Sequence, residues 1–168
     1  RSFCGMTQRA NKRRTMKRIN RKYPYVHPGL RSNHTAALAV YMDQSASVSS
    51  KDVEMLFGEL NNLGKKIDFQ LFPFDTSVDE ENSIKWRKGQ KVPPVRSRSG
   101  GTSFHVVPDH FHKNMDRFDG MIVLTDGECG DPGPSRKRRA WVIVPDRQLY
   151  FDPHSNDTVI QMKRRSDS

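Results

Sequence analysis

Apolar residues occur along the chain in short runs that have the length of β-strands. The run at 36–42 is unbroken and stops at Asp43, which is typical of a parallel strand buried on both faces. Three further runs share this length and end at polar or turn residues. Strands are therefore predicted over 36–42, 67–72 (ending at Pro73), 121–124 and 140–144. We expect 36–42 and 121–124 to lie near the middle of one sheet.

Two segments have the spacing of amphipathic helices. The first has apolar residues at helical spacing over 53–63, after capping residues at 49–52, and Gly64 is a predicted stop. The second follows the glycine turn at 99–103 and has Pro108 in its early turns. Strands that alternate with helices predict a mostly parallel central sheet flanked by helices, an α/β fold.

Two regions give weaker patterns. Residues 75–98 are polar, contain Pro93-Pro94 and predict a hairpin or long loop around 84–87. Residues 148–151 and 158–162 predict a hairpin at the edge of the sheet.

The net charge of +10 lies entirely at the start of the chain. Residues 1–42 hold ten Lys and Arg and no Asp or Glu, and the remainder is formally neutral. Such an arm can bind phosphates, lie on an acidic partner or serve as a solvated linker. The candidate contacts for nucleic acid or an acidic partner are Arg13, Arg14, Lys17, Arg18, Arg21 and Lys22.

Composition narrows the class of protein. The mean hydropathy is −0.81, and the longest apolar runs fall far short of the roughly 20 residues that cross a bilayer. Two cysteines, Cys4 and Cys129, form neither a disulfide framework nor a four-cysteine zinc site, so we expect a reducing, cytoplasmic location. A start at Arg1 with no signal-peptide pattern predicts a fragment or a processed chain.

Polar side chains gather where the predicted strands end. Asp43-x-Ser45-x-Ser47 follows the first strand, Thr102 precedes the second helix, and Asp126 follows the strand at 121–124. In an open parallel sheet, ligands bind at the carboxyl ends of the strands. Two carboxylates and three hydroxyls are oxygen donors of the kind that Mg²⁺ accepts. These five residues are therefore candidates for a cation site.

This constellation resembles the metal-ion-dependent adhesion site of von Willebrand factor A (VWA) domains. More narrowly, four stretches resemble the VWA-like domain that follows a predicted metallopeptidase domain in bacterial and phage proteins. They are Arg18–Pro24, Ser99–Phe104, Leu124–Glu128 and Ala140–Ile143. The resemblance implies a VWA-like, Rossmann-like α/β domain over 35–162, between a basic arm or linker at 1–34 and a polar tail at 163–168.

The resemblance also implies roles. Ser45, Ser47 and Thr102 would bind Mg²⁺, or Mn²⁺, through hydroxyls, with Asp43 and Asp126 bound directly or through water. A partner protein would supply a carboxylate to the open position, and the domain would be a non-catalytic adaptor for a MoxR-type AAA+ ATPase. Two departures from the family pattern are Ala46, in place of a glycine, and Gln44, in place of a smaller or β-branched residue.

Several alternatives stay open at this point. The five residues could cap loops and helices, or the metal site could be vestigial. The domain could bind nucleic acid through the basic arm, or form the C-terminal part of a longer metallopeptidase-like protein. His-Glu-x-x-His is absent from this chain, so peptidase activity is not assigned to it.

Other conspicuous residues receive ordinary interpretations. Surface or packing roles are predicted for the histidines, the tryptophans and Cys129, and a solvated loop for the second basic cluster. These residues are His105, His110, His112, Trp86, Trp141, Cys129 and Arg136–Arg139.

Overall fold

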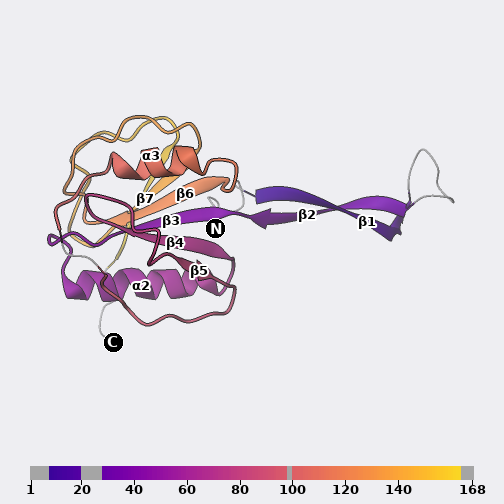
Figure 1. Cartoon of the computed structure of the whole chain (residues 1–168), viewed down its shortest axis with the longest axis horizontal. Coiled ribbons are helices and arrows are strands. Elements are labelled where there is room, and N and C mark those ends of the chain that lie inside the picture. Colours follow the sequence, from indigo (N-terminus) through magenta and orange to yellow (C-terminus); the bar gives the residue numbers. More distant parts are fainter. Residues whose placement is uncertain (1–7, 20–27, 98–99, 164–168) are drawn as a thin grey trace.

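The computed structural model describes residues 8–19, 28–97 and 100–163. Six strands form one sheet in the order β5-β4-β3-β6-β7-β8, with helix α2 on one face and helix α3 on the other (Figure 1). All neighbours are parallel except β4 and β5. The bounds are β3 Leu38–Asp43, α2 Ser50–Gly64, β4 Phe69–Phe74, β5 Ile84–Trp86, α3 Val106–Lys113, β6 Gly120–Thr125, β7 Arg138–Ile143 and β8 Asp157–Gln161.

The two central strands are β3 and β6, as the apolar runs predict. Every residue of both strands is buried, and they pair in parallel from Leu38 opposite Gly120 to Met42 opposite Leu124. One face packs on α2 and the other on α3. A strand covered on both faces has no solvent-facing positions, which explains the continuous apolar run.

Helix α2 begins at the predicted cap. The Ser49 hydroxyl accepts from the Asp52 backbone N–H, and the Asp52 carboxylate accepts from the Ser49 N–H, which completes a capping box. The helix ends at Gly64, as predicted, but this glycine has no positive φ. A Cβ at Gly64 would collide with the Trp86 indole, so the glycine makes room for that buried ring.

Strand β4 runs through Pro73, so the prediction that it ends there is wrong. The Pro73 carbonyl accepts from Asp79 N–H at 2.8 Å, on the side of β4 away from β3. The backbone N–H and C=O of one strand residue point to the same side of the strand. The N–H that Pro73 lacks would therefore also have pointed away from β3. Strand β5 pairs only with residues 69–71 and has no partner position there. The proline therefore removes no bond from the ladder with β3.

The predicted edge hairpin of 148–151 with 158–162 is also wrong. Strand β8 pairs in parallel with β7, and 148–151 is not a strand. The Phe151 ring instead packs on Trp141, with centroids 5.3 Å apart, and on Phe104 at 6.3 Å. Burial of this aromatic ring against the core holds the segment over the face of the sheet.

The prediction of a solvated loop for the second basic cluster is wrong in part, because Arg138 and Arg139 belong to β7. Arg136 and Arg138 are exposed. The Lys137 ammonium, however, donates to the carbonyls of Met115 and Phe118, both at 2.6 Å. The side chain of Arg139 is fully buried and pairs with Asp157. Two of the four cations therefore stabilise the fold.

The prediction of packing and surface roles for the histidines and tryptophans is confirmed. Trp86 and Trp141 are buried, and His105 and His112 are exposed. His110 lies between Tyr41 Oη, 2.8 Å from its Nδ1, and Glu80 Oε1, 2.8 Å from its Nε2. Burial, partly offset by Glu80, lowers the pKa of His110 below its ordinary value.

The depressed pKa of His110 gives a pH dependence of stability. As the pH falls below 7.5, the unfolded chain takes up a proton at this histidine before the folded domain does, so the unfolding free energy decreases. We expect this decrease to be smaller in His110→Gln, by up to about 1.4 kcal/mol per pH unit, the limit for one titrating group. Urea unfolding from pH 7.5 to 5 measures the difference, and equal slopes for the two proteins would contradict it.

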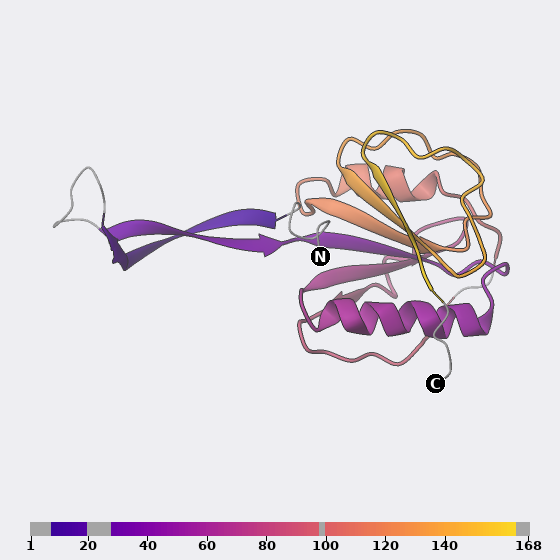
Figure 2. The same cartoon turned by 180° about the vertical axis from the view of Figure 1, so that it is seen from behind.

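The basic arm forms an antiparallel hairpin of β1, Gln8–Ile19, and β2, Pro28–Ala36. Figure 2 shows this hairpin projecting away from the sheet, with β2 leading directly into β3. Arg13, Arg14, Lys17 and Arg18 belong to β1, whereas Arg21 and Lys22 lie outside the described residues. The division at residue 34 stays a prediction.

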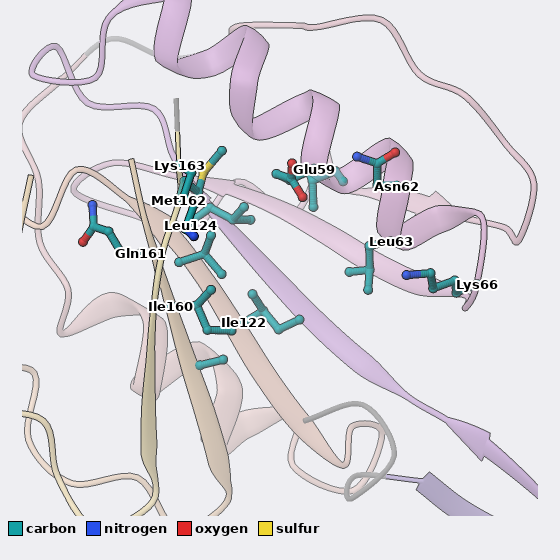
Figure 3. Close-up of a pocket in the computed structure, with 13 residues that line it drawn as sticks. Glu59, Asn62, Leu63, Lys66, Ile122, Leu124, Ile160, Gln161, Met162 and Lys163 are labelled. Atoms are coloured by element: carbon teal, nitrogen blue, oxygen red, sulfur yellow. The ribbon is translucent and has the colours of Figure 1, made fainter. Parts of the chain in front are cut away.

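The sheet face beside α2 is open over β6, β7 and β8. A groove of about 460 Å³ lies there, with Ile122, Leu124 and Ile160 on its floor, and Glu59 of α2 and Lys66, which follows the helix, at its side (Figure 3). Within the described parts of the chain, no helix is long and apolar enough to cross a bilayer.

Candidate functional site

Two carboxylates lie at the carboxyl edge of the sheet because β3 and β6 are neighbours. Asp43 is the last residue of β3, and Asp126 directly follows β6. Thr125 joins the two strand ends, since its hydroxyl donates to Asp43 Oδ2 at 2.7 Å. Residues 82 positions apart in the sequence thus meet at one point.

The segment after β3 folds back on Asp43. The Ser45 backbone N–H donates to Asp43 Oδ1 at 2.9 Å. The hydroxyl oxygens of Ser45 and Ser47 are 2.9 Å apart, so these alternate side chains converge. Val48 N–H closes the turn by donating to the Ser45 carbonyl at 3.2 Å.

Asp126 has the least satisfied side chain of the site. Its residue is 1% exposed, and Oδ1 accepts from Glu128 N–H at 3.1 Å. Its Oδ2 is buried and has no hydrogen-bond partner. A buried, unpartnered polar atom costs about 1–3 kcal/mol, and more when it is charged. This oxygen therefore has the properties of a ligand atom.

Burial raises the pKa of Asp43, and the Asp126 carboxylate raises it further. Hydrogen bonds from Ser45 and Thr125 act in the opposite direction. Two carboxylates that repel each other in a buried setting favour a cation between them, because a positive charge removes the repulsion.

Contacts of Gly100 and Thr102 place the segment 100–102 between the other two segments. The Ala46 N–H donates to the Gly100 carbonyl at 2.9 Å, and the Cys129 thiol lies 3.6 Å from the Thr102 carbonyl. Gly100 packs so closely on Asp75 that a Cβ there would come within 2.9 Å of the carboxylate. The structure therefore assembles all three predicted loops at one edge of the sheet.

A metal ion at this edge of the sheet would need hydroxyl ligands as well as carboxylates. Within residues 8–19, 28–97 and 100–163, no three His, Cys, Asp or Glu side chains gather in a way that could hold a metal. Two carboxylates with the hydroxyls of Ser45, Ser47 and Thr102 instead give a hard, oxygen-only set that fits Mg²⁺.

The two departures from the family pattern are accommodated. Ala46 is exposed and has no positive φ, so a glycine is not required at that position. Gln44 is buried, and its amide holds the backbone of residues 95–97 beside the site. Gly127, by contrast, has φ +85°, and a Cβ there would collide with the Gln148 carbonyl.

The sequence pattern assigns no supporting role to three residues that hold the site together. They are Thr125, Gln44 and Arg96, whose guanidinium donates to backbone carbonyls of the serine loop. Thr125 could have been found, because it directly precedes Asp126 at a strand end. Nothing in the sequence pattern marks Arg96, which is 51 residues from Ser45.

No family model matches the chain. An uncharacterized protein of Thermotoga maritima is 25% identical over 143 residues, which cover 85% of this chain and 35% of that protein. The chain thus spans about a third of the length of this relative.

Solved structures show the fold. The ArnB paralog VWA2 from Sulfolobus acidocaldarius superimposes with a TM-score of 0.54 at 13% identity, over 72% of this chain and 38% of that one. Proximal thread matrix protein 1 of the mussel byssus gives 0.51 at 16% identity, over 67% and 38%. With its six-stranded, mostly parallel sheet between helices, this chain has a VWA-like α/β fold.

Proposed function

We propose that this domain binds a partner protein through a divalent cation, Mg²⁺ or Mn²⁺, held by Asp43, Ser45, Ser47, Thr102 and Asp126. The observation that carries the proposal is the buried Asp126 Oδ2 without a hydrogen-bond partner, next to a second carboxylate. A cation would neutralise both carboxylates and accept the serine and threonine oxygens as further ligands.

The role we propose for the cation is adhesive. Five side chains leave an octahedral ion with an open position, and a carboxylate from the partner would occupy it. The domain would then be a non-catalytic adaptor, and a MoxR-type AAA+ ATPase is the partner class that the sequence resemblance suggests. The reaction of a longer protein that contains this domain is a separate question.

Titration calorimetry of the chelator-stripped protein with Mg²⁺ and Mn²⁺ tests the metal site. We expect saturable binding of one ion. Absence of heat with either ion, in protein whose unfolding transition is intact, would contradict the proposal. Capture of the MoxR-type ATPase from the same organism on immobilised protein tests the partner, and we expect EDTA to abolish it.

Nucleic-acid binding is a second candidate, favoured by the projecting hairpin of β1 and β2. Its strands carry arginine and lysine but no acidic residue, and a two-stranded β-ribbon fits the major groove. This candidate differs in its salt response, since log K falls by about 0.9 per phosphate contact. EDTA should have no effect on nucleic-acid binding, whereas it should abolish the metal-dependent capture of a partner protein.

A further inference from the structure

Residues 92–97, here called the strap, lie beside the loop that carries Ser45 and Ser47. Arg96 Nη2 donates to the carbonyl of Ser45 at 2.8 Å and to that of Val48 at 2.5 Å. These two carbonyls stand at the two ends of the serine turn. One guanidinium group therefore holds the turn closed from outside.

Gln44 fixes the strap next to this contact. Its Nε2 donates to the Val95 carbonyl at 3.1 Å, and its Oε1 accepts from Ser97 N–H at 2.7 Å. Gln44 is 1% exposed, so these bonds are shielded from water. They flank Arg96 on both sides and set the direction of its side chain.

The other end of the strap is anchored on helix α2. Asn61 Nδ2 donates to the Val92 carbonyl, and Asn61 Oδ1 accepts from Val92 N–H, both at 3.1 Å. The strap is thus tied to α2 and to the end of β3, while Pro93 and Pro94 restrict the backbone between the ties. A strap fixed in this way offers Arg96 as a preorganised donor.

We propose that Arg96 is a positioning residue for the cation site, acting through the backbone of the serine turn. The inference rests on the proposed function, because it concerns the same five ligands. Without the guanidinium, the carbonyls of Ser45 and Val48 lose a charged donor, and the turn that brings the two hydroxyls within 2.9 Å is less constrained. Metal binding would then have to order the turn, and this cost would lower the affinity for the metal.

The test compares Arg96→Ala and Arg96→Lys with wild type, using Arg87→Ala as the control. Arg87 is an exposed arginine in the same connection between β4 and α3, so its loss changes the charge equally. Mg²⁺ affinity is measured by calorimetry. Hydrogen exchange is measured without metal at the amides of Ser45, Ala46 and Val48, which donate within the site.

For Arg96→Ala, we expect about a tenfold loss of Mg²⁺ affinity, equivalent to roughly 1.4 kcal/mol, together with faster exchange at the three amides. Arg96→Lys keeps a cationic donor and should therefore recover part of the lost affinity. Arg87→Ala should bind Mg²⁺ as wild type does. A urea unfolding transition measured for Arg96→Ala itself, and compared with that of wild type, shows whether a loss of affinity reflects a failure to fold.

Two results would overturn the proposal while the metal site stands. One is unchanged exchange in Arg96→Ala, which would mean that the guanidinium does not hold the turn. The other is faster exchange with unchanged affinity, which would make Arg96 a purely structural residue. If wild type binds no Mg²⁺, the proposed function itself fails and the positioning role fails with it.

Discussion

Replacement of Asp126 by Asn is expected to lower the affinity for Mg²⁺ by about 100-fold or more, which is roughly 2.7 kcal/mol. The variant removes one negative charge and exchanges the unpartnered Oδ2 for an amide nitrogen, which is a hydrogen-bond donor and not a metal ligand. Its Oδ1 can still accept from Glu128 N–H, so the local turn is kept. Calorimetric titration of the chelator-stripped proteins measures the loss.

The same substitution is expected to leave the metal-free domain as stable as wild type, or more stable. Asp126 opposes the ionisation of Asp43, and the amide removes that repulsion. The matched control is Asp109→Asn, which removes a charge from an exposed position on α3 and should alter neither quantity. An Asp126→Asn protein that binds Mg²⁺ with wild-type affinity would show that this carboxylate is not a ligand. Urea unfolding in the absence of metal measures the free energy of unfolding of each protein.

Replacement of Arg139 by Met is expected to lower the unfolding free energy by about 3–5 kcal/mol, because it leaves the buried carboxylate of Asp157 without its cation. The two side chains are fully buried and form two bonds of 2.8 Å. The guanidinium also lies 4.9 Å from the centre of the Trp141 ring. Urea denaturation gives the value directly.

A double variant separates the charge from the packing. In Arg139→Met with Asp157→Asn, no buried charge remains, and the amide oxygen can still accept from Trp141 Nε1 and His154 N–H. The double variant should therefore lose less stability than the sum of the two single variants. Strict additivity would mean that the two groups do not interact. Arg136→Met, at an exposed position that precedes β7, is the control and should change stability by less than about 0.5 kcal/mol.

The sequence pattern was most informative where one physical requirement dominated. The apolar run that forms β3 and the capping residues of α2 depend on burial and on local hydrogen bonds, so they are readable from neighbouring residues. The errors have another origin. Pro73 is tolerated because β5 is short, and 148–151 is not a strand because Phe151 packs on Trp141. Both depend on parts of the chain distant in sequence.

The candidate site shows the same division. The five ligands could be proposed from the sequence because their side-chain chemistry is visible there, and three of them stand directly after predicted strands or in the loop that follows one. The structural roles of Arg139 and Arg96 were not recognised. The sequence alone does not distinguish an arginine that is buried or bonded to a carbonyl from one that lies in solvent. Their roles come from distant contacts, with Asp157 and with the Ser45 carbonyl.

The meeting of Asp43 and Thr125, 82 residues apart, has a consequence for the folding of the chain. A cation held by the three loops would act as a reversible cross-link that closes long segments of polypeptide. The unfolded chain has no such set of oxygens within reach, so the ion would bind the native state alone. Each tenfold rise in free ion above the dissociation constant would then add about 1.4 kcal/mol to the free energy of unfolding. The concentration of free Mg²⁺ would in that case set the fraction of folded domain as well as its affinity for a partner.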